Sequence, residues 1–390
     1  MKTLSPWFLC LLIMISAFTS AQQLAPTSQG CPTAYLKAAI DWPQISFDTC
    51  HTGYNPHEFV LSPATVGNLT LRWKYTTGDA IVSSPVVVNN IVYVGSFDGK
   101  IYALKAKTGM VVWTYTTGGE IWSSAAVVNG VVYIGSTDDI VYALNATTGA
   151  LLWKFATGFF VYSAPTVANG VVYVPSGDHY VYALNAASGA LIWKYATGDL
   201  VVSNPAVVNG VVYVGSDDSF VYALNAATGA LLWRYQTEAF IHSSPTVFSG
   251  VVYIGSGDFN VYALNAATGA LLWKYTTGNF VEASPAVANG LVYIGSADND
   301  VYALNAATGA LVWRYTTGNV VLSGASIANG VVYIGSDDTS VYALNASTGA
   351  FLWKYTADYY VEPSPAVVNG AMYVGSGDRN LYAFGLDDAK

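Results

Sequence analysis

The sequence predicts an all-β fold, an eight-bladed β-propeller of four-stranded antiparallel blades. Three observations support it. Tryptophan recurs every 40 residues without insertion or deletion, at Trp73, Trp113, Trp153, Trp193, Trp233, Trp273, Trp313 and Trp353. Each 40-residue copy holds four short strand-like runs separated by turn residues, which is the content of one propeller blade. The series also begins and ends with single strands that can complete one another.

The copy spanning residues 261–300 shows the four runs. They cover residues 261–266, 270–275, 281–288 and 291–296. The first two are joined through Gly269, which can supply a positive-φ turn, and the last two through Asn289-Gly290, the strongest short hairpin signal. We name the strands A (Val281 type), B (Leu291 type), C (Val301 type) and D (the tryptophan strand).

The two ends of the series predict a closed ring. The chain enters on a lone D strand, residues 69–76, and leaves on a lone C strand, residues 381–386. Pairing them completes the eighth blade and removes two exposed sheet edges, which would otherwise promote aggregation. We therefore expect the propeller to cover residues 69–390 and to be a monomer.

The N-terminal residues 1–21 are predicted to be a signal peptide. Lys2 precedes an apolar stretch, and the small residues Thr19 and Ala21 suit a cleavage site near Ala21. The apolar stretch is too short to remain as a bilayer anchor, so we expect no transmembrane segment. The mature protein is expected to be periplasmic or secreted.

Residues 22–68 are interpreted as an N-terminal arm that caps or straps the propeller. Its two thiols, Cys31 and Cys50, are the only cysteines left after removal of the signal peptide. In an exported chain they are predicted to form one disulfide bond. Neither belongs to a Cys-x-x-Cys pair or lies in a ligand cluster, so the bond is structural and no metal site is expected.

The net charge and the residues that all copies share exclude two kinds of binding site. The chain has 15 Lys and Arg against 24 Asp and Glu, a formal net charge of −9, which argues against a nucleic-acid partner. One aspartate recurs in every B–C turn: Asp98, Asp138, Asp178, Asp218, Asp258, Asp298, Asp338 and Asp378. One per blade around a wide ring cannot share a metal ion, so these residues are predicted to hydrogen-bond to the turn backbone.

The segment Ala-Leu-Asn-Ala-Ala-Thr-Gly-Ala-Leu-Leu-Trp, residues 263–273 and its copies, resembles the tryptophan-docking motif of PQQ-type β-propellers. That family includes quinoprotein alcohol dehydrogenases and the outer-membrane assembly protein BamB. The resemblance covers residues 69–386. The sequence departs from the family pattern by carrying Asn where Asp is usual, with Lys105 once at that position and Ser188 once in place of Thr.

Differences between the copies point to a binding face. They concentrate in the D–A connections and the B–C turns, which lie at the same end of an up-down meander, whereas the opposite end is uniform. The candidate binding residues on this face are Glu120, Trp122, Phe160, Tyr162, His242, Glu282, Tyr360 and Glu362. A single individualised face is typical of binding on a repeat scaffold. The alternative is neutral drift in tolerant loops.

The sequence favours a non-catalytic binding or scaffold propeller whose partner is an envelope or extracellular protein, or a small polar ligand. The alternative is a PQQ-dependent dehydrogenase acting on alcohols or sugars. For that alternative the resemblance implies PQQ held by calcium with Glu, Asn and Asp ligands, and in many members a pair of adjacent cysteines. The propeller contains no cysteine and no long insertion. No residue is carried over as a PQQ ligand, and no cofactor is expected.

A third alternative is hydrolysis by Glu282 and Glu362. It depends on the separation of two carboxylates, which a sequence does not give. We rank it below the other two.

Overall fold

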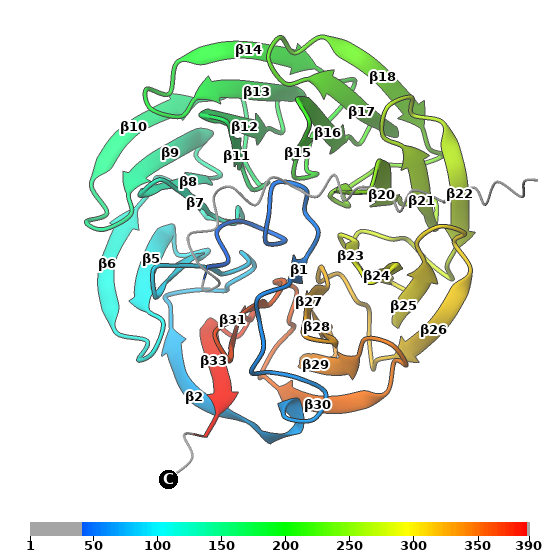
Figure 1. Cartoon of the computed structure of the whole chain (residues 1–390). Coiled ribbons are helices and arrows are strands. Elements are labelled where there is room, and N and C mark those ends of the chain that lie inside the picture. The colour runs from blue at the N-terminus through cyan, green and yellow to red at the C-terminus, as the bar shows by residue number, and fades with distance from the viewer. Residues whose placement is uncertain (1–40, 388–390) are drawn as a thin grey trace, which may run out of the picture.

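Eight sheets stand around a central axis in the computed structural model, which describes residues 41–387 (Figure 1). Each has the four strands of a blade, and one of them gains a short parallel strand from the N-terminal arm. The predicted eight-bladed propeller is confirmed. The predicted signal peptide and Cys31 lie outside the described residues, so the signal peptide and the Cys31–Cys50 bond stay predictions. Among the described residues, no helix is long and apolar enough to cross a membrane.

The strands follow the order A to D from the axis outward. The A strands are β3 (Val86–Val88), β7 (Ala126–Val128), β11 (Thr166–Ala168), β15 (Ala206–Val208), β19 (Thr246–Phe248), β23 (Ala286–Ala288), β27 (Ser326–Ala328) and β31 (Ala366–Val368). The B strands are β4 (Ile91–Gly95), β8 (Val131–Gly135), β12 (Val171–Pro175), β16 (Val211–Gly215), β20 (Val251–Gly255), β24 (Leu291–Gly295), β28 (Val331–Gly335) and β32 (Ala371–Gly375). The C strands are β5 (Lys100–Lys105), β9 (Ile140–Asn145), β13 (Tyr180–Asn185), β17 (Phe220–Asn225), β21 (Asn260–Asn265), β25 (Asp300–Asn305), β29 (Ser340–Asn345) and β33 (Asn380–Leu386). The D strands are β2 (Leu69–Thr76), β6 (Val111–Thr116), β10 (Leu151–Ala156), β14 (Leu191–Ala196), β18 (Leu231–Gln236), β22 (Leu271–Thr276), β26 (Leu311–Thr316) and β30 (Phe351–Thr356). The N-terminal arm adds β1 (Tyr54–Asn55) and the 3₁₀ helix η2 (Val66–Asn68).

The ring closes in the eighth blade, where β2 pairs antiparallel with β33. The register runs from Leu69 opposite Leu386 to Thr76 opposite Asn380. Figure 1 shows blue β2 beside red β33, although they come from opposite ends of the chain. The predicted closing strand is therefore confirmed.

The A strands are shorter than predicted. We expected residues 281–288 to be one strand, but only Ala286–Ala288 pair as β23. In the first blade the reason is visible: the Ser83 hydroxyl accepts a hydrogen bond from Gly95 N and donates one to Gly95 O, both 2.8 Å, so a side chain replaces the backbone ladder. Pro285 and its counterparts in five other blades also lack the N–H that a strand would donate. The residues before each A strand are therefore loops at the axis.

The A–B hairpins have the conformation that Asn-Gly predicts. Asn129 and Gly130 have φ values of 51° and 78°, as a type I′ turn requires. Asn89 and Asn90, which lack glycine, have φ values of 52° and 62°. The A–B turns at the uniform end of the ring therefore share one conformation.

Each repeated tryptophan joins its blade to the next one. Trp113 donates its indole N–H to the carbonyl oxygen of Ala146 in the following blade at 2.9 Å. Its ring covers Gly149, where an added Cβ would lie 2.7 Å from the indole, so that turn position requires glycine. At the closing blade Trp353 donates instead to Leu69 O at 3.1 Å, because the arm takes the place of the missing turn.

The aspartate of each B–C turn accepts hydrogen bonds within its turn, as predicted, and also holds the preceding loop. Asp258 Oδ1 accepts from Asn260 N at 3.0 Å. Its Oδ2 accepts from the Tyr262 hydroxyl at 2.6 Å and from Glu238 N, in the D–A connection, at 2.9 Å. The D–A connections, which differ between the copies, are therefore held in place by an aspartate that all copies share.

Residues 42–55 of the arm, which we call the plug, cover the inner edges of all eight blades. Backbone carbonyls accept hydrogen bonds from the A strands in six blades: Val87 to Trp42, Val127 to Pro43, Val207 to Thr49, Val247 to Cys50, Val287 to Thr52 and Ile327 to Gly53. In the other two, Val167 N donates to Gln44 Oε1 and Asn55 Nδ2 donates to Val367 O. Figure 1 shows this blue segment at the centre of the ring. The described part of the arm thus caps the axis.

Candidate functional site

A cavity of about 190 Å³ lies on the axis at the individualised end of the ring. The loops that precede the A strands form its wall, and Ile45 of the plug lines it as well. Because the plug covers the inner strand edges at the other end of these strands, the cavity is a cup rather than a through-channel. We call its opening the mouth.

One side of the mouth is aromatic. The ring centroid of Trp122 lies 4.5 Å from that of Phe97 and 5.2 Å from that of Tyr162. Phe160 extends this cluster, with its centroid 5.2 Å from Tyr162. The indole N–H of Trp122 donates to Glu120 Oε2 at 2.9 Å, which orients the ring, and the residue is 40% exposed. The cluster therefore offers an accessible aromatic surface.

The other side of the mouth carries titratable groups centred on His242. Its Nε2 lies 3.1 Å from Asp217 Oδ1, and its Nδ1 lies 3.5 Å from Glu282 Oε1. Burial disfavours a charged imidazole, but the hydrogen bonds and negative charges of Asp217 and Glu282 outweigh it and raise the pKa of His242 to about 9. At neutral pH this histidine is a cation that compensates two carboxylates.

Glu362 has no positively charged side chain beside it among the described residues. Burial and the neighbouring charges of Asp337 and Glu282 raise the pKa of Glu362 to about 7. Asp337 Oδ1 is itself buried without a hydrogen-bond partner among the described residues, and burial together with Asp338 raises the pKa of Asp337. This part of the cavity wall therefore lacks positive charge.

Hydroxyl groups line the cavity beneath the mouth and link neighbouring blades. The N–H of Ser84 donates to Ser124 Oγ at 2.8 Å, and the same bond joins Ser244 to Ser284 at 3.1 Å and Ser364 to Ser84 at 2.9 Å. Each accepting hydroxyl retains its own proton to donate. The deeper wall is thus polar and rigidly held.

The predicted site residues fall into two groups. Trp122, Tyr162 and Glu362 line the cavity. The other five support it: Glu120 binds the indole of Trp122, Phe160 packs on Tyr162, Glu282 pairs with His242, and Tyr360 packs over Gly377.

Sequence reasoning missed Phe97, Asp217 and Asp337. They occupy the position before the invariant aspartate of the B–C turn, where the copies carry Phe97, Thr137, Gly177, Asp217, Gly257, Ala297, Asp337 and Gly377. This variation is visible in the sequence and could have identified them. Ile45 could not be found in this way, because the plug has no copy with which to compare it.

Replacing Glu362 with Gln is expected to raise stability at high pH only. A carboxyl whose pKa is about 7 when folded and near 4.5 when unfolded binds protons more tightly in the folded state, so it destabilises the fold increasingly as pH rises from 4.5 to 7. Glu362→Gln should therefore stabilise the protein by roughly 1–3 kcal/mol at pH 8 and leave it unchanged at pH 4.

Urea unfolding at the two pH values measures this difference. Glu120→Gln, at an exposed rim position, is the matched control and should show a much smaller pH-dependent gain. Equal stability of Glu362→Gln and wild type at pH 8 would contradict the assigned environment of Glu362.

The fold and the repeated tryptophan contacts define a PQQ-type β-propeller. The chain belongs to the family described as outer membrane protein assembly factor BamB, whose model matches residues 68–124, 116–215, 138–247, 218–327 and 316–390. No curated protein sequence is significantly similar to the chain.

Solved structures show the same fold at low identity. BamB from Moraxella catarrhalis has a TM-score of 0.72 and 20% identity, over 81% of this chain and 99% of that one. A europium-containing methanol dehydrogenase has a TM-score of 0.80 and 15% identity, over 90% of this chain and 99% of that one. The computationally designed Ika8 protein has a TM-score of 0.73 and 18% identity, over 80% of this chain and 97% of that one. An outer membrane protein assembly factor, a methanol dehydrogenase and a designed protein share this architecture, so function depends on the site.

Proposed function

We propose that the protein is an exported, non-catalytic binding propeller. The face on which the copies differ binds an envelope or extracellular protein, or a small polar ligand. That partner places a positively charged group in the mouth. The observation that carries this proposal is the cup lined by Trp122 and Tyr162 together with the uncompensated Glu362. Aromatic faces and carboxylates are the two groups that attract an organic cation, and partial burial strengthens both interactions.

Charge distribution around the cup supports a cation over an anion. His242 already compensates Asp217 and Glu282, whereas Glu362 and Asp337 have no cation beside them among the described residues. No Lys or Arg lines the cavity. A bound ammonium or guanidinium group would favour the ionised form of Glu362, so binding should tighten as pH rises from 6 to 8.

The residues present do not fit the PQQ alternative. PQQ carries three carboxylates, and the charged side chain that lines the cup is the carboxylate of Glu362. The cavity of about 190 Å³ is smaller than the ~300 Å³ at the low end of small-molecule sites. Among residues 41–387, no group of three or more His, Cys, Asp or Glu is placed to hold a metal ion.

The test replaces four mouth residues with valine. Valine is already present at the equivalent position of two other copies, as Val82 and Val202, so the repeat accommodates it. The variant Trp122→Val, His242→Val, Glu282→Val, Glu362→Val is expected to keep its fold. It should lose capture of the partner that the wild type retrieves from envelope extract. The matched control, Thr147→Ala with Ser347→Ala on the uniform face, should behave like wild type.

Choline and its uncharged isostere 3,3-dimethylbutan-1-ol test the charge preference by titration calorimetry. We expect choline to bind at least about tenfold more tightly, and more tightly at pH 8 than at pH 6. Equal binding of both compounds contradicts a cation site, while equal capture by the valine variant and wild type contradicts the binding face. Reduction of an electron-acceptor dye after incubation with PQQ, Ca²⁺ and an alcohol would favour the enzyme instead.

A further inference from the structure

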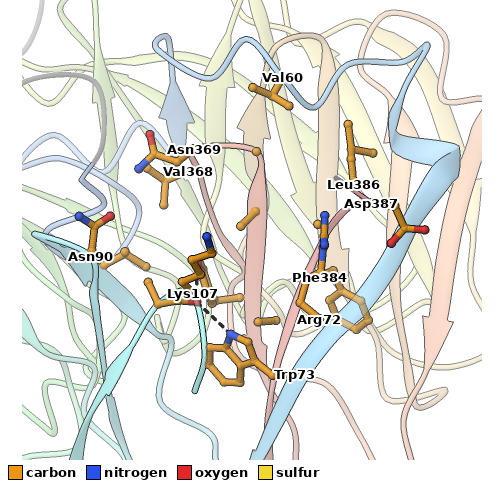
Figure 2. A pocket seen from close by; sticks show the side chains of 17 residues that line it. Val60, Arg72, Trp73, Asn90, Lys107, Val368, Asn369, Phe384, Leu386 and Asp387 are labelled. Atoms are coloured by element: carbon orange, nitrogen blue, oxygen red, sulfur yellow. Dashed lines mark hydrogen bonds between the residues drawn. The ribbon is translucent and has the colours of Figure 1, made fainter. Parts of the chain in front are cut away.

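A second pocket, of about 660 Å³, lies at the seam between the eighth blade and the first (Figure 2). It opens among the A–B turns of Asn90 and Asn369 and beside Lys107 in a C–D turn, at the end of the ring opposite the mouth. This volume falls within the ~300–1,000 Å³ typical of small-molecule sites. We call it the seam pocket.

The seam pocket exists because the eighth blade lacks a C–D turn. In six other blades an asparagine ends the C strand and caps that turn, as when Asn145 Oδ1 accepts from Thr147 N at 3.0 Å. In the eighth blade the C and D strands come from opposite ends of the chain, and Gly385 stands at the asparagine position. Because Gly385 has no side chain, the Arg72 side chain lies against it, with its Nε 3.0 Å from the position that a Cβ would take. Phe384 and Leu386 line the pocket beside it.

Two cations at this pocket are unique to the seam. Arg72 occupies a position that is Leu, Ile or Val in every other blade. Lys107 occupies one that is Ala, Thr or Ser in the six other blades that have a C–D turn. Figure 2 shows Lys107 and Arg72 on opposite sides of the pocket, both above Trp73. Neither forms an ion pair with any residue of the described chain. In a protein of net charge −9, this is a local positive site.

Much of the remaining lining is apolar. Val60, Val368, Phe384 and Leu386 supply apolar surface. The one carboxylate in the lining, Asp387, accepts a hydrogen bond from Thr70 Oγ1 at 3.0 Å and lies beside Leu386. Apolar surface together with two cations that form no ion pair is complementary to a molecule with an apolar body and an anionic head.

We propose that the seam pocket binds a small aliphatic carboxylate, with its chain against Phe384 and Leu386 and its carboxylate between Arg72 and Lys107. The site is separate from the mouth and does not depend on the function proposed for it. The volume of about 660 Å³, which lies within the range of small-molecule sites, favours a small molecule over an extended acidic peptide.

The probe is decanoate, compared with decan-1-ol and decyltrimethylammonium by titration calorimetry on the full chain. Decanoate is expected to bind at least about tenfold more tightly than either, because charge-assisted hydrogen bonds require the anion. Three variants restore the residue that other blades carry and so should fold: Arg72→Leu, Lys107→Ala and Gly385→Asn. The first two remove a cation and the third displaces the Arg72 side chain from its place against Gly385. Each should weaken decanoate binding at least about fivefold.

Lys105→Asn is the matched control. It lies in the same turn as Lys107, outside the pocket lining, and also restores the residue of the other blades. It should leave the affinity for decanoate unchanged. Equal binding of decanoate and decan-1-ol, or wild-type affinity in Arg72→Leu and Gly385→Asn, would overturn the proposal.

Discussion

A variant lacking residues 22–76 is expected to form oligomers. It loses β2, so β33 becomes an exposed edge strand in a three-stranded blade. The D strands of other molecules carry nearly the same side chains as β2, including the tryptophan and tyrosine that face β33. Strand exchange between molecules is therefore favoured, as is common in repeat proteins.

Size-exclusion chromatography with light scattering measures this outcome. The matched variant lacks residues 22–60 and keeps β2, so it should remain a monomer like the full chain. If the longer deletion is equally monomeric and equally heat-resistant, β2 does not close the ring.

Removing residues 22–60 is expected to lower stability strongly while leaving the ring closed. This deletion removes the plug, whose hydrogen bonds reach the A strand of every blade. Trp42 and Phe47 are also buried, at 2% exposure each, and their contacts are lost. Even with water replacing some of the hydrogen bonds, the loss should be on the order of 5 kcal/mol.

The control is the pair Cys31→Ser and Cys50→Ser in the full chain. It removes the predicted disulfide, which is expected to contribute about 3 kcal/mol, while retaining the plug. Thermal unfolding of the three proteins separates the two contributions. A deletion variant no less stable than the serine variant would show that the plug contributes little.

The repeat made most of the fold predictable. Eight equally spaced tryptophans gave the blade count, and the lone runs at residues 69–76 and 381–386 gave the closure. The A strands were overestimated because a periodic apolar pattern does not reveal that Ser83 replaces the backbone partner of Gly95. Single-sequence patterns describe which residues are buried better than which backbone groups are paired.

The site was predictable only where the copies could be compared. Trp122, Tyr162 and Glu362 stand out because their counterparts differ, and all three line the cup. The arm was expected to cap or strap the propeller, but the contacts of the plug with the A strands could not be predicted, because its irregular backbone follows no strand or helix period. The ion pair between His242 and Asp217 could not be predicted either, because the distance between these two variable positions depends on the radius of the ring.

The plug also changes how a repeat protein should unfold. In an open array each repeat contacts only its neighbours, so segments can melt independently. Here one stretch of 14 residues touches all eight blades, with contacts such as Asn55 to Val367 across 312 positions of sequence. Opening any one blade loosens the segment that the other seven share, so the ring should melt in a single cooperative transition. Such distant contacts also make folding slow, because the segment can seat only after the last blade has arrived.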